Sequence, residues 1–200
     1  MRRSRRCLSN SSLALLATLL LGACAHAPAL APATTRPASR ITDLDRRPYD
    51  PFAKVGRATV LLFITNDCPI SNGYAPEIHR LCDAYARRDI AFCLVYADPT
   101  ITAAAARQHY RDYGYTCPAV LDPAHELSTR AGATVTPEAA VFLADGKLVY
   151  RGRIDDLYLD YGKARFVATT HDLRDALDAV AGGKPMKLRT TVAVGCHIPM

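Results

Sequence analysis

The sequence has no apolar run of the roughly 20 residues that a membrane-spanning helix requires. Its longest N-terminal run, from Leu13 to Leu21, is far shorter than that. The sequence also contains no CxxCH haem-attachment motif, no glycine-rich phosphate loop and no specific Ser-His-Asp pattern, and its histidines lack metal-ligand spacing. These absences argue against an integral membrane protein, a c-type cytochrome, a P-loop enzyme and a serine hydrolase.

The N-terminus is typical of a secretory signal peptide. Residues 2–6 carry four arginines, and the short apolar run that follows ends in small residues. Residues 21–24 (LGAC) resemble a bacterial lipobox, which implies cleavage after residue 23 and lipidation of Cys24. Ala25 follows, and its resemblance to known sorting signals favours the outer membrane. We expect a periplasmic protein that contacts the membrane only through its lipid, and the export route, general secretory or twin-arginine, stays open.

Most of the excess positive charge lies in this signal. Removing the four arginines of residues 1–23 lowers the net charge from +6 to +2, and no dense basic patch occurs later. A nucleic-acid partner is therefore not expected. Residues 24–40 are rich in alanine and proline without periodicity, which predicts an extended tether between the lipid and the folded domain.

Residues 41–183 alternate between apolar strand-like runs and segments of helical spacing, which predicts one α/β domain with a central mixed β-sheet flanked by helices. A hairpin is indicated by Ala144-Asp145-Gly146, Thr170 is the predicted N-cap of the last helix, and Asp155-Asp156 is interpreted as a solvated turn. Residues 184–200 form a tail without a strong element. Strands are expected at residues 58–65, 90–97, 118–121, 139–143 and 147–151, and helices at residues 75–88, 101–113, 125–131 and 171–181.

Cys68 is the candidate reactive centre. It stands where the first buried strand ends and a helix begins, the position at which parallel α/β sheets place reactive groups. The unpaired N–H groups at a helix N-terminus stabilise a thiolate, which is the species that attacks disulfides and peroxides. The alternative reading, a buried inert cysteine, is less common at such a turn.

Two spacings resemble the thioredoxin superfamily. Pro76 follows Cys68 by eight residues, like the proline of the thioredoxin active-site helix, and Thr136-Pro137 resembles the cis-proline loop that faces the reactive sulfur. The segments CPISNGYAPEIHRL, TPEAAVFLADGKLVYRGRIDD and GCHIP are similar to the bacterial redoxins related to alkyl hydroperoxide reductases. This resemblance implies a thioredoxin-like fold and a thiol–disulfide oxidoreductase in which Pro137 shapes the substrate groove. Its implied partners are protein thiols and disulfides, or a small peroxide, and an exported electron donor, without a cofactor.

The sequence departs from both relevant motifs. Ser71 replaces the second cysteine of a CxxC pair, so a mixed disulfide at Cys68 cannot be resolved within the motif. Thr65 matches the threonine of the peroxiredoxin motif and is predicted to hydrogen-bond a peroxide or the thiolate, although the proline and arginine of that motif are absent. Arg151 or Arg153 replaces the missing arginine only if the fold brings it to the site. A peroxiredoxin-like thiol peroxidase is therefore the alternative function.

The other cysteines differ in their expected distance from Cys68. Cys82, Cys93 and Cys117 are predicted about 15 Å or more away, at the opposite end of the sheet, and a disulfide requires Cα atoms within about 7 Å. Cys117 is a candidate for a structural bond with Cys82 or Cys93, or all three are small buried hydrophobic residues.

Cys196 lies on the predicted flexible tail, and we expect it to reach Cys68 and act as the resolving thiol. Gly195 permits a close backbone approach to the site. The alternatives are a loose terminal cysteine and a less favoured Cu(I) site built from Cys68, Cys196 and His197, because soft thiolate and imidazole ligands suit Cu(I).

Overall fold

The computed structural model describes residues 41–53 and 56–199. The predicted signal peptide, the lipidation site Cys24 and the tether lie outside the described residues. Within the part of the chain that is described, no helix is long and apolar enough to cross a membrane.

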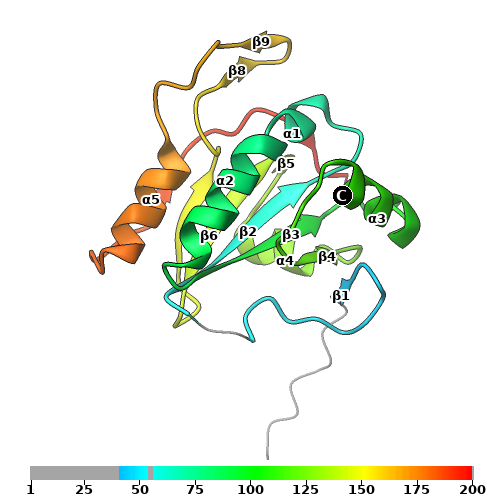
Figure 1. Cartoon of the computed structure of the whole chain (residues 1–200), viewed down its shortest axis with the longest axis horizontal. Helices are drawn as coiled ribbons and strands as arrows, with labels where there is room; N and C mark the ends of the chain where they lie inside the picture. The colour runs from blue at the N-terminus through cyan, green and yellow to red at the C-terminus, as the bar shows by residue number, and fades with distance from the viewer. Residues whose placement is uncertain (1–40, 54–55, 200) are drawn as a thin grey trace, which may run out of the picture. The chain divides into compact units, whose positions relative to one another are not determined.

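A seven-stranded mixed sheet forms the centre of the fold, in the order β1-β4-β3-β2-β6-β7-β10 (Figure 1). The central strand β2 (Ala58–Ile64) is buried along its whole length, as expected for an apolar run with strands on both sides. It pairs in parallel with β3 (Ile90–Tyr96) and antiparallel with β6 (Glu138–Leu143). The remaining strands are β1 (Thr42–Asp43), β4 (Ala119–Leu121), β7 (Leu148–Gly152) and β10 (Arg189–Thr190). The predicted mixed α/β architecture is confirmed.

Two core layers cover the faces of the sheet. Alternate residues of β2 point to opposite faces, so Val60 and Leu62 belong to one apolar cluster and Leu61 and Phe63 to the other. The first cluster includes residues of α2 (Ala75–Ala86), α3 (Ala103–Asp112) and α5 (Asp172–Ala181), and the second includes residues of α4 (Glu126–Ala131).

The helix boundaries differ from the prediction in two places. A separate short helix, α1 (Pro69–Gly73), precedes α2, and the two are divided at Tyr74. The N-cap of α5 is His171 rather than Thr170. The Thr170 side chain instead donates to the carboxylate of Asp172, the first residue of α5, at 3.3 Å. Thr170 therefore still supports the first turn of the helix, although it precedes the N-cap by one residue.

The C-terminal tail is docked on the fold, which corrects the expectation of a flexible segment without an element. Strand β10 extends the sheet in parallel with β7, and β11 (Cys196–His197) pairs antiparallel with β5 (Val135–Thr136). The Ile198 side chain is buried in the second core cluster, and its N–H donates to the Thr134 carbonyl at 3.0 Å. These strands are two residues long, too short to produce a periodic pattern in the sequence.

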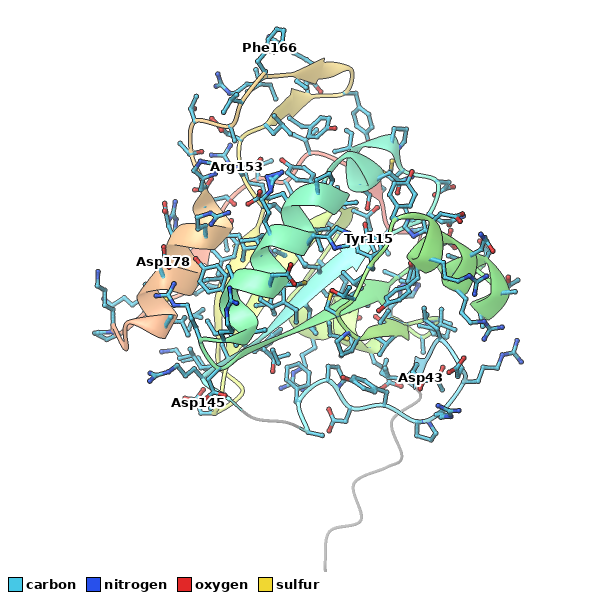
Figure 2. All side chains as sticks on the ribbon, viewed as in Figure 1. Asp43, Tyr115, Asp145, Arg153, Phe166 and Asp178 are labelled. Carbon is cyan, nitrogen blue, oxygen red and sulfur yellow. The ribbon has the colours of Figure 1, made fainter. Side chains whose placement is uncertain are left out.

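A small hairpin of β8 (Tyr158–Asp160) and β9 (Lys163–Ala164) projects beyond α1 and α5 (Figure 1). Phe166 points outward after it and is fully exposed (Figure 2). Asp155 and Asp156, which lead into the hairpin, are buried, so the interpretation as a solvated turn is wrong. Asp155 accepts the Tyr74 hydroxyl at 2.6 Å, and Asp156 accepts backbone N–H groups of residues 169–170, which explains how the two carboxylates tolerate burial.

Candidate active site

Cys68 is fully buried at the junction of β2 and α1 and is the N-cap residue of α1. Its sulfur accepts the N–H of Ser71 at 3.5 Å. Pro69 at the first helical position needs no N–H partner, which suits the start of a helix. The start of α1 thus directs one backbone N–H donor at the Cys68 sulfur.

The Thr136–Pro137 loop lies against Cys68, as the sequence predicts. The Cys68 thiol donates to the Thr136 carbonyl at 3.3 Å, and the Thr136–Pro137 peptide bond is cis. Thr136 is the last residue of β5, and only Pro137 separates it from β6 of the central sheet. The loop and the α1 N-terminus therefore hold the sulfur from two directions.

Cys196 is brought to the same place by strand pairing. In the β11–β5 register it lies directly opposite Thr136, whose hydroxyl donates to the Cys196 carbonyl at 3.4 Å. Burial raises the pKa of the Cys196 thiol to about 11, and the adjacent Cys68 thiol adds to this rise as its hydrogen-bond partner. Both thiols are free in this structure.

The close approach of β11 depends on Gly195. A Cβ atom at this position would lie 2.0 Å from the Thr136 carbonyl oxygen and 2.6 Å from its carbon. Real Cβ atoms do not come so near to backbone atoms, so only glycine allows this docking. The expectation that Gly195 permits a close backbone approach is confirmed.

Tyr161 is a site residue that the sequence reasoning missed. It lies in the turn between β8 and β9, and its hydroxyl donates to the Gly195 carbonyl. Its hydroxyl also interacts with the Cys196 thiol and partly opposes the rise in the pKa of that thiol. No motif or periodicity marks this tyrosine, because its relevance depends on a hairpin that folds back over a distant strand.

The Thr65 hydroxyl is not directed at Cys68. It donates to the Asp67 carboxylate at 2.9 Å, and more weakly to the Asn66 side chain at 3.4 Å. The Asp67 charge is among the causes that raise the pKa of Cys196. Thr65 thus contacts the reactive pair indirectly, through the loop that precedes Cys68.

The two arginines considered for a peroxidase site are held elsewhere. Arg151 donates to the Gly132 carbonyl at 2.7 Å and lies 3.6 Å from Glu138. Arg153 forms an ion pair with Asp172 at 2.7 Å. Neither guanidinium is presented to Cys68 in this arrangement.

A polar network anchors α1 to the rest of the fold. Asn72 donates to the Asn66 carbonyl at 3.0 Å, and its side-chain oxygen lies 2.9 Å from His109 Nε2. The other ring nitrogen of His109 lies 2.8 Å from the Tyr96 hydroxyl. Burial lowers the pKa of His109, so a neutral ring fills this position at pH 7. His109 is a second residue near the site that sequence analysis missed, because the histidines are scattered along the chain without a motif.

The metal alternative finds no support from side-chain clustering. Among the described residues, no group of three or more His, Cys, Asp or Glu side chains is placed to hold a metal ion. His197 is exposed and follows Cys196 on β11, one strand of the two-stranded β11–β5 sheet.

Comparison with known proteins places this geometry in a family. Residues 29–158 match the Redoxin family. The chain belongs to the redoxin family. The resemblance recognised in the sequence is thus confirmed, and family membership supports thiol–disulfide oxidoreductase chemistry at a site of this kind.

Solved structures show the same fold for this redoxin. An uncharacterised conserved protein from Geobacillus kaustophilus is 27% identical, with a TM-score of 0.68 over 80% of this chain and 87% of that one. A hypothetical protein from Sinorhizobium meliloti 1021 is also 27% identical, with a TM-score of 0.68 over 79% and 88%. A thiol-disulfide oxidoreductase from Bacteroides fragilis has 17% identity and a TM-score of 0.50 over 56% and 84%. No match was found among curated proteins.

Proposed function

We propose that this redoxin is a two-cysteine thiol–disulfide oxidoreductase in which Cys68 is the nucleophile and Cys196 the resolving thiol. The observation that carries the proposal is the docking of β11, which pairs Cys196 with Thr136. The carbonyl of the same Thr136 accepts a hydrogen bond from the Cys68 thiol at 3.3 Å. Ser71 removes the usual partner from the CxxC position, and the tail supplies another through β11.

The surroundings of the two thiols are unequal, which supports separate roles. Cys68 receives a backbone N–H donor, whereas Cys196 is half-buried beside Cys68 and near the negative charge of Asp67, and its pKa is raised to about 11. At neutral pH Cys196 is therefore a protonated thiol that can donate its hydrogen to a Cys68 thiolate. This assigns the first attack to Cys68 and the second to Cys196.

The cycle is written in the reducing direction. The Cys68 thiolate attacks one sulfur of a substrate disulfide, which gives a mixed disulfide and releases the other substrate sulfur as a thiolate. Cys196 then gives up its proton and attacks the Cys68 sulfur, which releases the second substrate thiol and leaves a Cys68–Cys196 disulfide. The substrate gains two electrons, and an exported dithiol donor returns the enzyme to its reduced form. The same steps in reverse oxidise a substrate dithiol.

Disulfide exchange fits this site better than peroxide reduction. In a peroxidase, a cationic or hydroxyl donor beside the sulfur polarises the peroxide, but the Thr65 hydroxyl is bound to Asp67 and Arg153 to Asp172. Pro137 and the cis-peptide loop instead present backbone next to Cys68, and in our proposal Pro137 shapes the groove for a substrate polypeptide. Thr65 supports the loop that carries Asp67, and Tyr161 covers β11.

The proposed setting is the periplasmic side of the cell envelope, with the domain held by a lipid on Cys24 and a tether to residue 40. This location rests on the sequence of the N-terminal segment. It supplies an oxidising compartment in which protein disulfides persist as substrates.

The test is trapping with oxidised glutathione. Wild-type protein is expected to form the Cys68–Cys196 disulfide, whereas Cys196→Ser is expected to stop at a Cys68–glutathione mixed disulfide. Cys93→Ser is the matched control, because Cys93 is buried on the opposite face of the sheet and should leave the product unchanged. Mass mapping that finds Cys196 unmodified while Cys68 pairs with another residue would refute the assignment, and a peroxide-consumption assay separates the peroxidase alternative.

A further inference from the structure

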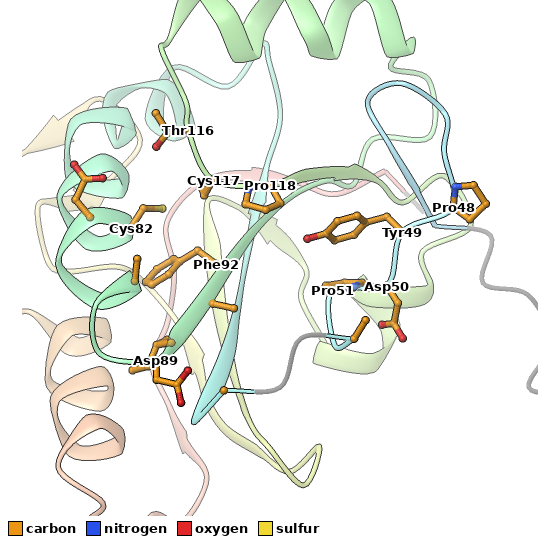
Figure 3. Close-up of a pocket in the computed structure, with 16 residues that line it drawn as sticks. Pro48, Tyr49, Asp50, Pro51, Cys82, Asp89, Phe92, Thr116, Cys117 and Pro118 are labelled. Carbon is orange, nitrogen blue, oxygen red and sulfur yellow. The ribbon is translucent and has the colours of Figure 1, made fainter.

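Two thiols outside the proposed cycle face each other on the α2 side of the sheet. Cys82 lies on the inner face of α2, roughly 10 Å along the helix from its first residue at about 1.5 Å per residue. Cys117 lies in the turn before β4, and Figure 3 shows the two side chains side by side on these facing elements. Both belong to the same core cluster.

Both cysteines are held by rigid parts of the fold. The Tyr110 hydroxyl donates to the Cys117 carbonyl at 3.0 Å, and the carbonyl of the next residue, Pro118, accepts the Leu94 N–H of strand β3 at 2.8 Å. Cys82 is the eighth residue of the twelve-residue helix α2 and one of its buried residues, and α2 packs on the same strand. The interaction with Cys117 is the largest cause of a raised pKa at Cys82, which is consistent with direct contact between the thiols.

The pair borders a groove at the surface. Cys82 and Cys117 are buried, at 6% and 8% exposed, and both line a groove of about 970 Å³ whose walls include Tyr49, Pro51 and Phe92 (Figure 3). Cys93 provides the internal contrast. It is 1% exposed and belongs to the cluster on the other face of the sheet, because it is offset by one residue from Phe92 along β3.

We propose that Cys82 and Cys117 are a second redox site, a dithiol that a protein or glutathione-type disulfide oxidises to an intramolecular bond. One thiol loses its proton and attacks the incoming disulfide, which forms a mixed disulfide and releases one thiol of the reagent. The second cysteine then attacks this mixed disulfide and releases the other thiol. The two cysteines lose two electrons and two protons, and the reagent disulfide becomes two thiols.

The bond would tie α2 to the start of β4 and close the loop of residues 82–117. A loop of about 36 residues gives a substantial loss of entropy in the unfolded chain. For a protein of this size we expect the melting temperature to rise by about 10 °C on oxidation. The proposal does not depend on the roles of Cys68 and Cys196.

The test therefore uses the full chain carrying Cys68→Ser and Cys196→Ser. The protein is equilibrated with oxidised glutathione, both in its folded state and during refolding from the reduced, denatured chain, and the cysteines are mapped by mass spectrometry. The expected result is a Cys82–Cys117 bond with a free Cys93 thiol and a higher melting temperature that falls again on reduction. Adding Cys93→Ala should preserve the shift and adding Cys117→Ala should abolish it.

Three outcomes would overturn the proposal. They are two free thiols after oxidative refolding, separate glutathione adducts without an internal bond, and pairing of Cys93 with either cysteine. Because refolding exposes every thiol to the reagent, burial in the native state cannot account for a negative result. The active-site experiment with Cys196→Ser fails or succeeds independently of this one.

Discussion

The substitution Gly195→Ala tests whether docking of β11 is what makes Cys196 a resolving thiol. The added Cβ atom would lie 2.0 Å from the Thr136 carbonyl oxygen, which belongs to strand β5 and cannot move aside like a flexible side chain. We expect β11 to move away from β5 and Cys196 to leave the neighbourhood of Cys68, while the rest of the fold is kept.

The expected change in the Cys68–Cys196 disulfide equilibrium can be worked out from the interactions that docking of β11 adds. Burial of Ile198 is worth about 2 kcal/mol, and the hydrogen bonds from the Ile198 N–H and the Thr136 hydroxyl are worth about 1 kcal/mol each. Losing half of this stabilisation, about 2 kcal/mol, corresponds to a roughly 30-fold smaller equilibrium constant for the Cys68–Cys196 bond. Cys196 then reaches Cys68 only as a thiol on a tethered chain, at a lower effective concentration.

The assay is equilibration with mixtures of reduced and oxidised glutathione, followed by acid quenching and mass analysis. Gly183→Ala is the control, because it replaces a glycine near the start of the same tail where a Cβ atom would have nothing within 4 Å. Its φ of +67° makes the substitution strained, so it should cost about 1 kcal/mol of stability without changing the disulfide equilibrium. An equilibrium constant for Gly195→Ala equal to that of the wild type would refute the reasoning.

Three further predictions use the same structure. Because the pKa of Cys196 is raised to about 11, its alkylation should remain slow at pH 8 and accelerate as the pH rises toward that value. In Cys68→Ser the acceleration should begin at lower pH, because the Cys68 thiol contributes to the raised pKa. Identical alkylation profiles of the two proteins, measured by peptide mass analysis, would contradict this contribution of Cys68. Ser71→Cys places a second thiol where the Ser71 hydroxyl is buried without a hydrogen-bond partner, so it should restore release of the Cys68–glutathione adduct in the Cys196→Ser background, and a persistent adduct would count against that geometry. Tyr74→Phe leaves the buried Asp155 without its 2.6 Å partner and should lower the free energy of unfolding by about 1 to 3 kcal/mol in urea, whereas an unchanged midpoint would show that water replaces the hydroxyl.

The central sheet could be predicted because burial on both faces leaves a strong pattern. The seven residues of β2 are all apolar or small, and each is buried. The strand end at Ile64 and the helix start at Pro69 then locate Cys68 from local signals alone. Strands of two residues, such as β5 and β11, carry no such pattern, since two residues cannot show a period.

The candidate site was predicted as far as its chemistry is local. Cys68 and Thr136-Pro137 are indicated by motif spacing. Cys196 was expected near Cys68 because the other thiols were predicted to be distant and the tail was predicted to be flexible, whereas the structure docks the tail as strand β11. The direction of the Thr65 hydroxyl and the contribution of Tyr161 depend on tertiary contacts with Asp67 and Gly195, which no short segment encodes.

The alternation of side chains along β3 distinguishes between the two candidate partners of Cys117, Cys82 and Cys93. Phe92 and Leu94 face the α2 side of the sheet, so Cys93 between them faces the other side. This alternation favours Cys82 over Cys93 once the strand is known to be central. The sequence alone left both open because a strand buried on both faces is apolar at every position.

The position of Cys196 in the chain gives the proposed site an order of assembly. Cys68 precedes Cys196 by 128 residues, and strand pairing between β11 and β5 brings Cys196 to the site. In the proposed cycle, a mixed disulfide that forms at Cys68 before this pairing cannot be resolved by Cys196. Docking of β11 therefore completes the proposed site, and a protein fused directly behind β11 would interfere with that step.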